Sequence, residues 1–291
     1  MRVLITGAHG QAGHELLRLA PEGFQAHGLG SAALDIADYH QALRVIEDYR
    51  PQLIINAAAY TAVDKAESEP ERAFAVNRDG VASLAVIAER LGIPLLHIST
   101  DYVFAGDGSR PYREEDQTGP TGVYGASKLA GEQALAINCT RHIILRTSWV
   151  FGSHGNNFVK TMLRLGRERE ELGVVADQYG CPTSAASIAR ALWALAEQYR
   201  DQGALHWGLY HFSGTPACSW HAFAVEIFQQ AHALGLLQRI PQVRAIGTAD
   251  YPTPATRPAW SVLDCSKLAA AHAIAQTDWR VELRAVLQEL A

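Results

Sequence analysis

The chain has 291 residues, 48% of them hydrophobic and 19% charged, which predicts a globular protein with one large α/β domain or two lobes. Its 25 basic and 30 acidic side chains give a net charge of −5 without a basic run, so we expect no nucleic-acid partner. The apolar opening Val3 to Ile5 is too short for a signal peptide, and no apolar run approaches the roughly 18 residues that cross a bilayer, so we expect a cytoplasmic protein without membrane contact.

Short apolar runs alternate with segments of helical periodicity along the first half of the chain. Near-continuous hydrophobic strands of this kind are typical of a parallel sheet covered on both faces. The pattern therefore predicts a Rossmann-like, doubly wound parallel sheet. We expect strands at 2–6, 52–56, 94–99 and 142–146 and helices at 11–20, 39–49, 71–91 and 123–138.

The alternation becomes less regular after about residue 150. We still expect a helix near 184–199 and a strand near 209–212, whereas the Pro-rich segment 251–258 cannot form a regular helix. We therefore predict a Rossmann domain made of residues 1–150 and 184–214, with a smaller lobe made of residues 151–183 and 215–291.

A glycine-rich turn, Gly7-Ala-His-Gly10-Gln-Ala-Gly13, follows the first expected strand and opens a helix. Glycines let the backbone approach a pyrophosphate, and a helix N-terminus offers free N–H groups. A strand, glycine turn and helix in this order predict a dinucleotide site, here spaced G-x-x-G-x-x-G. We expect cofactor contacts from Gly7, Gly10, Gln11, Ala12 and Gly13, and from the small residues Ala57, Ala58 and Ala59 after a later strand.

The preference between the two nicotinamide cofactors normally depends on the end of the second strand. An acidic residue there binds the ribose of NAD, and a basic residue binds the 2′-phosphate of NADP. The segment 26–31 has neither, so the sequence leaves NADH and NADPH open, with a slight preference for NADPH. Asp35 and Ile36 are expected to contact the adenine or ribose, and a solvated loop aspartate is the alternative for Asp35.

Tyr124 and Lys128 are four residues apart in an expected helix, so their side chains share one face. A phenol titrates near pH ~10 and needs a neighbouring positive charge to exchange protons at neutral pH. Ser99, Thr100 and Asp101 end a strand, at the edge where open α/β sheets bind ligands. A hydroxyl of Ser99 or Thr100 would bond a substrate carbonyl that Tyr124 protonates. A surface Tyr–Lys pair and a capping turn are the structural alternatives.

Together these residues resemble the extended short-chain dehydrogenase/reductase family, whose catalytic set is Ser/Thr, Tyr and Lys on a Rossmann fold. Within that family the chain is most similar to the dTDP-4-dehydrorhamnose reductases. The similarity rests on blocks that run from one end of the chain to the other, at 56–70, 99–104, 123–132, 146–150, 155–158, 177–183 and 251–258.

The resemblance implies an oxidoreductase that uses NADH or NADPH to reduce the C4 ketone of dTDP-4-dehydro-β-L-rhamnose. The product would be dTDP-L-rhamnose, a precursor of cell-surface polysaccharide such as the O-antigen of lipopolysaccharide. It implies that Tyr124 donates a proton to the C4 oxygen. Lys128 would hold the nicotinamide ribose and lower the pKa of Tyr124, and Thr100 would complete the catalytic set.

The same resemblance implies a sugar-nucleotide lobe and four substrate contacts. Thr100 and Asp101 would contact the sugar, and Trp149 would line the sugar pocket. Arg257, in the Pro-rich loop, would bind the nucleotide diphosphate, because a guanidinium binds phosphate oxygens bidentately. A buried core tryptophan and a surface loop arginine are the structural alternatives.

Some relatives dimerise through a divalent metal held by carboxylates, for which Glu15 and Glu289 are the counterparts here. The expected helix that opens at 184–187 lacks the acid that would complete the set, so we predict no metal and leave a homodimer open. The four cysteines are scattered without a C-x-x-C pair, which predicts neither a zinc site nor a disulfide framework.

Two other functions are compatible with the resemblance. One is a reductase of another dTDP-4-keto-6-deoxy sugar, such as one that yields the talose epimer. The other is a dinucleotide-binding regulatory subunit without turnover, like the methionine adenosyltransferase β subunit. The intact set of Thr100, Tyr124 and Lys128 favours catalysis over a regulatory role.

Overall fold

The centre of the molecule is a six-stranded parallel sheet, seen in a computed structural model that describes residues 1–291. Its strand order is β10-β5-β4-β3-β1-β2. The strands are β1 (Arg2–Thr6), β2 (Gln25–Leu29), β3 (Leu53–Asn56), β4 (Leu95–Thr100), β5 (His142–Thr147) and β10 (Gly208–His211). The order reverses beside β1, and the predicted doubly wound parallel sheet is confirmed.

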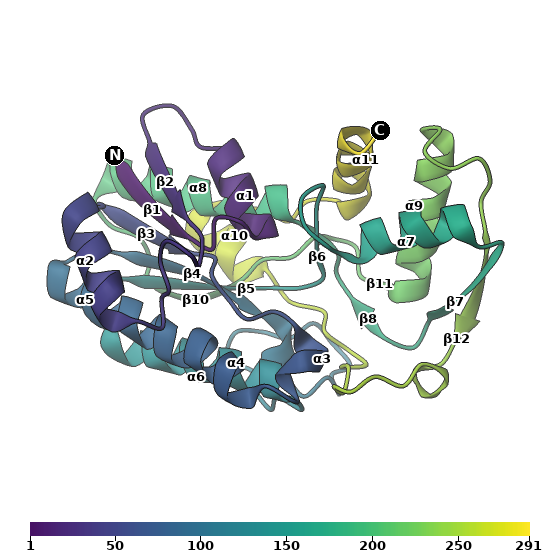
Figure 1. The fold of residues 1–291 in the computed structure, drawn as a ribbon, viewed down its shortest axis with the longest axis horizontal. Coiled ribbons are helices and arrows are strands. Elements are labelled where there is room, and N and C mark those ends of the chain that lie inside the picture. The colour runs from purple at the N-terminus through teal and green to yellow at the C-terminus, as the bar shows by residue number, and fades with distance from the viewer.

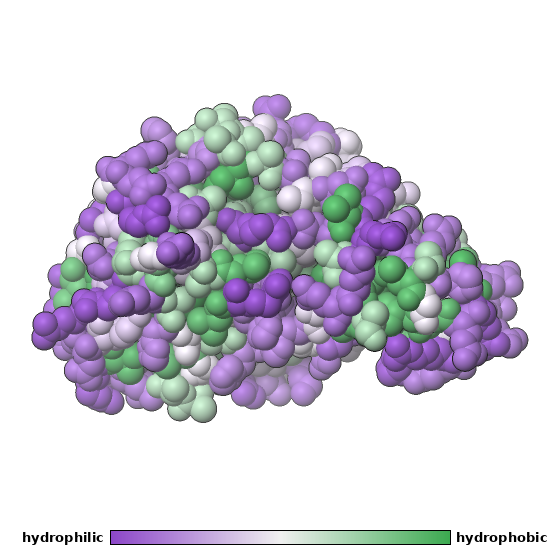
Figure 2. Space-filling view, turned by 90° about the horizontal axis from the view of Figure 1, so that it is seen from above, coloured by the Kyte–Doolittle hydropathy of each residue, from purple (hydrophilic) through white to green (hydrophobic).

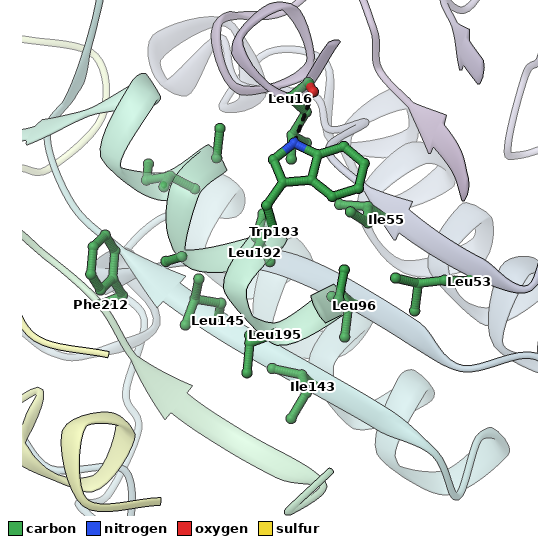
Figure 3. Packing of buried hydrophobic residues seen from close by; sticks show 14 of the residues in the cluster. Leu16, Leu53, Ile55, Leu96, Ile143, Leu145, Leu192, Trp193, Leu195 and Phe212 are labelled. Carbon is green, nitrogen blue, oxygen red and sulfur yellow. Dashed lines mark hydrogen bonds between the residues drawn. The ribbon is translucent and has the colours of Figure 1, made fainter. Parts of the chain in front are cut away.

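Helices cover both faces of this sheet (Figure 1). One face packs against α2 (Tyr39–Tyr49), α5 (Val81–Leu91) and α6 (Val123–Asn138), and the other against α1 (Gln11–Arg18), α8 (Ala185–Gln202) and α10 (Ser266–His272). Neighbouring strand residues alternate between the two layers: Ile54 faces α5, and Ile55 faces α8, as the two-residue period of a strand requires. On the α8 side, Trp193 donates its Nε1–H to the carbonyl of Leu16 at 2.9 Å (Figure 3).

The helix expected over 71–91 is divided in the structure. It consists of α4 (Pro70–Phe74), a π-helical turn (Ala75–Gly80) and α5, preceded by the short α3 (Val63–Ala66). Asn77 lies in the π turn with its buried side chain bonded to both backbone groups of Tyr60, at 2.9 and 3.0 Å, and to Ser127 Oγ at 3.0 Å. These long-range bonds account for the extra residue in the turn, which helical periodicity alone does not predict.

The rest of the chain builds a second group of elements with its own hydrophobic core, at the right of Figure 1. Phe151, Phe223 and Leu283 are fully buried in this core. Its elements are β6 (Val150–Phe151), α7 (Phe158–Glu168), β7 (Glu171–Val175), β8 (Tyr179–Gly180), β9 (Thr183–Ser184), β11 (Cys218–Ser219), α9 (Trp220–Ala233), β12 (Gln242–Ile246) and α11 (Trp279–Glu289).

One face of the molecule is mainly hydrophilic. Figure 2 shows polar side chains over most of one face, with only scattered hydrophobic areas. The chain contains no helix of the length and apolarity that a bilayer crossing requires.

Candidate active site

A cleft of about 820 Å³ opens at the carboxyl ends of β1, β3 and β4, between the sheet and the second group of elements. This is the position at which open α/β sheets bind ligands. The cleft brings together predicted cofactor and substrate residues that are far apart in the sequence: Gly7, Gly10, Gln11, Ala12, Asp35, Ile36, Ala57, Ala58, Ala59, Thr100, Asp101, Tyr124, Lys128 and Trp149.

The glycine-rich turn is packed so closely that side chains would not fit. Gly7 has a φ of +69°, and a Cβ there would lie 2.6 Å from the carbonyl oxygen of Ala57. Gly13 does not line the cleft; instead it holds α1 against the turn, because a Cβ on it would lie 2.2 Å from Gly7 O. Gly10 caps α1 without a side-chain bond. The first N–H groups of α1 are therefore available to an anion such as a pyrophosphate.

The end of β2 lies against the glycine-rich turn. A Cβ on Gly30 would be 2.4 Å from Nδ1 of His9, so the imidazole ring lies directly over that end, and His9, Gly30 and Ser31 all line the cleft. Asp35 also lines the cleft, while its Oδ1 accepts from the Ala37 N–H at 3.0 Å. The side chain that lies against the strand end is thus His9, which precedes β2 in the sequence.

Two buried polar atoms of the cleft have no hydrogen-bond partner in the protein, Asp101 Oδ2 and Thr147 Oγ1. Thr100 donates its hydroxyl to the other oxygen of Asp101 at 3.0 Å. Burial raises the pKa of Asp101 to about 6, and the neighbouring hydroxyls of Ser261 and Thr100 oppose this rise. Buried polar groups are normally paired, so this wall of the cleft is suited to a ligand rich in hydroxyl groups.

Tyr124 projects from the first turn of α6 into the cleft, where its ring meets Tyr102 edge to face with 5.4 Å between centroids. Burial raises the pKa of Tyr124 to about 12, and a hydrogen bond with Thr100 opposes this rise. The resemblance implies a lowered pKa for Tyr124, whereas in the protein alone burial raises it.

Lys128 is buried with its Nζ against β4. Nζ donates to the carbonyl of Ile98 at 2.7 Å and lies 3.3 Å from Nε2 of His97. Burial lowers the pKa of Lys128 to about 8, and the charge of Glu132 opposes that effect. The amine is therefore fixed in place and close to losing its proton.

Ser99 and Thr100 differ in their surroundings. The Ser99 hydroxyl donates to Glu132 Oε1 at 2.5 Å, and Glu132 forms a buried ion pair with Arg146 at 2.6 Å. The Ser99 hydroxyl is therefore held by a buried ion pair, whereas the Thr100 hydroxyl donates to Asp101, which also lines the cleft.

Trp149 has a φ of +47°, a conformation that residues other than glycine rarely adopt. Its indole stacks on Trp220 with 3.5 Å between centroids and 7° between planes, and its other neighbours include Gly180, where a Cβ would lie 2.5 Å from the ring. Trp149 is partly exposed in the cleft. The stack joins the cleft wall to α9.

Arg257 does not line the cleft. Its Nη2 pairs with Asp64 Oδ2 at 2.8 Å, which ties the Pro-rich loop to α3. Burial raises the pKa of Tyr102, and the charge of Arg257 opposes this rise. The pair therefore lies at the side of the cleft where Tyr102 stands.

Sequence reasoning missed several residues of the cleft, including Tyr60, Tyr102, Thr147 and Ser148. Tyr102 and Thr147 adjoin strand ends, a signal that would have found them. No group of three or more His, Cys, Asp or Glu side chains is arranged to hold a metal ion. Glu15 pairs with Arg18 at 2.5 Å, and Arg18 lies 3.4 Å from Glu289, so a guanidinium stands between the two carboxylates.

The fold and cleft together define a Rossmann-fold protein of the extended short-chain dehydrogenase/reductase type. The model of the RmlD substrate binding domain family matches residues 1–291, and the chain belongs to that family. It is 47% identical to the dTDP-4-dehydrorhamnose reductase of Aggregatibacter actinomycetemcomitans, over 97% of each chain. It is 42% identical to the enzyme of that name from Escherichia coli K12, over 100% of this chain and 98% of the relative.

Solved structures with the same description share the fold over the whole chain. The dTDP-4-dehydrorhamnose reductase of Clostridium acetobutylicum has a TM-score of 0.91 at 36% identity, covering 100% of this chain and 99% of the other. The enzyme from Bacillus anthracis in complex with NADP has a TM-score of 0.90 at 39% identity, covering 99% of both chains.

Proposed function

We propose that the protein reduces the C4 ketone of dTDP-4-dehydro-β-L-rhamnose to dTDP-L-rhamnose with NAD(P)H, within the synthesis of cell-surface polysaccharide precursors. The observation that carries this proposal is a single cleft that joins Tyr124, Lys128 and Thr100 to the glycine-rich turn of Gly7. Full-length similarity to dTDP-4-dehydrorhamnose reductases supports the substrate, and the NADP complex of the Bacillus anthracis relative supports the cofactor.

The cleft residues would divide the reaction between them. The nicotinamide supplies a hydride to C4 when it is bound. Tyr124 gives its hydroxyl proton to the C4 oxygen, so the C=O group becomes CH–OH and the phenol becomes a phenolate. The ammonium of Lys128 stabilises that phenolate by its charge. Thr100 would orient the C4 oxygen by turning its O–H from Asp101 Oδ1 to that oxygen.

The remaining cleft residues would bind the substrate. Asp101 Oδ2 and Thr147 Oγ1 are the unpaired buried groups that sugar hydroxyls would satisfy. Trp149 lines the cleft while its ring is stacked on Trp220, and the part of the indole that faces the cleft would pack against the sugar. The guanidinium of Arg257 is held by Asp64. It would have to leave that salt bridge to bind a diphosphate.

We also propose the division into lobes that the sequence predicts, with residues 1–150 and 184–214 binding the dinucleotide and residues 151–183 and 215–291 binding the sugar nucleotide. The separate hydrophobic cores support it, except for α10, whose Leu268 packs in the core of the sheet. A cytoplasmic location rests on the composition alone. A homodimer rests on the family resemblance, and light scattering after size-exclusion chromatography would test it.

The activity is tested by following NAD(P)H absorbance with enzymatically prepared dTDP-4-dehydro-L-rhamnose and by identifying the product by NMR. Cofactor oxidation with formation of dTDP-L-rhamnose is the expected result. Formation of a C4 epimer such as the talose would assign a different keto-sugar reductase. Cofactor binding without reduction of any 4-keto sugar would contradict the enzymatic proposal.

A further inference from the structure

A buried line of polar groups runs behind Lys128, outside the cleft. Asn56 ends β3, His97 lies within β4, and both side chains are fully buried. The amide nitrogen Nδ2 of Asn56 is 2.9 Å from His97 Nδ1, and His97 Nε2 is 3.3 Å from Lys128 Nζ. Neither Asn56 nor His97 lines the cleft, and Lys128 is the cleft residue that His97 contacts.

The direction of these hydrogen bonds follows from one backbone group. The N–H of Ala58, which can only donate, lies 3.0 Å from Oδ1 of Asn56, so the carbonyl end of the amide must face it. The hydroxyl of Thr6 donates to the same oxygen at 2.6 Å. The NH₂ end of Asn56 therefore faces His97 and can only donate to Nδ1.

The tautomer of His97 follows in turn. Burial and the charge of Lys128 hold the pKa of His97 well below its ordinary value, although the backbone of Asn56 acts to raise it, so the imidazole is neutral. A neutral imidazole carries one proton, and Nδ1 accepts from Asn56, so the proton is on Nε2. His97 then directs an N–H donor at Lys128 Nζ.

An ammonium group has only donors, whereas a neutral amine has one lone pair that can accept. We propose that Asn56 and His97 are positioning residues that hold an Nε2–H donor against Lys128 and thereby favour its neutral amine. The amine accepts from His97 and still donates to Ile98 O. Burial acts in the same direction, since it lowers the pKa of Lys128 to about 8.

The other ionisable groups near Lys128 do not cancel this effect. Glu132, on the same helix, opposes the lowering of the pKa of Lys128, but its two oxygens are bonded to Arg146 of β5 at 2.9 and 2.6 Å. Asp101 and Tyr124 stand in the cleft, and Asp101 bonds to Thr100. His142, on β5, acts only to lower the pKa of His97 further.

The consequence for catalysis rests on the proposed function. If the charge of Lys128 stabilises the phenolate of Tyr124, the substrate is reduced only while Lys128 is an ammonium. The reductase activity is then lost as the pH rises through the pKa of Lys128. Asn56 and His97 would bring that loss close to physiological pH. The catalytic rate kcat would therefore have an alkaline limit set by residues that never touch the substrate.

Asn56→Asp reverses the direction of the hydrogen bonds that join residue 56, His97 and Lys128. A carboxylate still accepts from Ala58 and Thr6, but it also accepts from His97, so the proton moves to Nδ1 and Nε2 accepts from an ammonium. We expect the alkaline limit of kcat to rise by about one pH unit or more, a shift worth roughly 1.4 kcal/mol. Thr6→Val is the matched control, because it removes one hydrogen bond to Asn56 Oδ1 and leaves the direction of the bonds to His97 and Lys128 unchanged. The alkaline limit of kcat in this variant should match that of the unaltered enzyme.

A second measurement does not depend on turnover. The chain has four lysines, so the ¹⁵N signal of Lys128 Nζ is assigned by its absence in Lys128→Met, and the ¹⁵N shifts of His97 report its tautomer. We expect Nε2–H in the unaltered protein, Nδ1–H in Asn56→Asp, and a higher Lys128 pKa in that variant. An Nδ1–H tautomer in the unaltered protein, or a Lys128 titration that Asn56→Asp leaves unchanged, would overturn the proposal even if the reductase activity is confirmed.

Discussion

Glu132 of α6 and Arg146 of β5 form a buried ion pair, with 2.6 Å between Oε2 and Nη2 and 2.9 Å between Oε1 and Nε. The Ser99 hydroxyl donates to the same carboxylate, and the guanidinium lies over the ring of Phe104 at 5.0 Å. Because α6 also carries Tyr124, this bidentate pair joins the helix of the proposed acid to the sheet.

Removing the guanidinium should destabilise the fold. Arg146→Met leaves the Glu132 carboxylate buried without its cation, and we expect a loss of about 3–5 kcal/mol in the free energy of unfolding, measured by urea denaturation. Arg164→Met is the control, because the Arg164–Glu168 pair is exposed on α7 and should cost about 0.5 kcal/mol or less. Equal losses in the two variants would contradict a structural role for the buried pair.

Tyr124→Phe removes only the hydroxyl that we assign as proton donor. Loss of a general acid should lower kcat by roughly 10²–10⁴-fold while cofactor affinity, measured by fluorescence titration, stays within about twofold. Tyr49→Phe is the control, since its hydroxyl bonds to Gln25 O away from the cleft. A variant at Tyr124 that retains full turnover would exclude this residue as the acid.

The buried carboxyl of Asp101 should make stability depend on pH. Its pKa rises from 3.8 to about 6 on folding, because burial disfavours the charge. The native state thus binds more protons between these values, and stability falls as the pH rises through that window. Asp101→Asn should therefore be roughly 2–3 kcal/mol more stable than the unaltered protein at about pH 8 and similar near pH ~4.

The exposed Asp48→Asn is the control for this pH dependence. It should follow the unaltered protein at both pH values in urea denaturation. If the gain in stability of Asp101→Asn is no larger at high pH than at low pH, ionisation of the buried carboxyl does not destabilise the folded protein.

His9 should contribute to the choice of cofactor, because its ring lies over Gly30 at the end of β2, where a 2′-phosphate of NADP would be recognised. His9→Ala should lower kcat/KM for NADPH by about tenfold and leave the value for NADH little changed, since only the phosphate loses a donor. The exposed His40→Ala should change neither value. Equal losses with both cofactors would assign His9 to the pyrophosphate or to the fold.

Arg257 should matter for the sugar nucleotide. Arg257→Met is expected to raise KM for the dTDP-sugar by about tenfold or more, because a charged hydrogen bond to phosphate is lost, while KM for the cofactor stays constant. Asp64→Asn keeps the guanidinium and removes its partner, so its KM should change less. Steady-state kinetics that show the larger effect for Asp64→Asn would indicate that the salt bridge acts through the fold.

Local features of the sequence were sufficient for the fold. The alternation of buried strands and amphipathic helices is repeated along the chain, and the strands at 2–6 and 142–146 lie within a residue of their observed bounds. The turn from Gly7 to Gly13 is also local, because a strand, a glycine turn and a helix are adjacent in sequence. Such patterns can be read without knowing which segments meet.

Contacts between distant segments were decided only by the tertiary structure. The register of β3 beside β4 places Asn56 next to His97, and β1 beside β2 brings His9 to Gly30. The sequence predicted that Tyr124 and Lys128 share a helix face, which follows from helical spacing. It did not predict that Lys128 would be bonded to β4, because hydrogen-bond direction and burial depend on neighbours that only the folded sheet supplies.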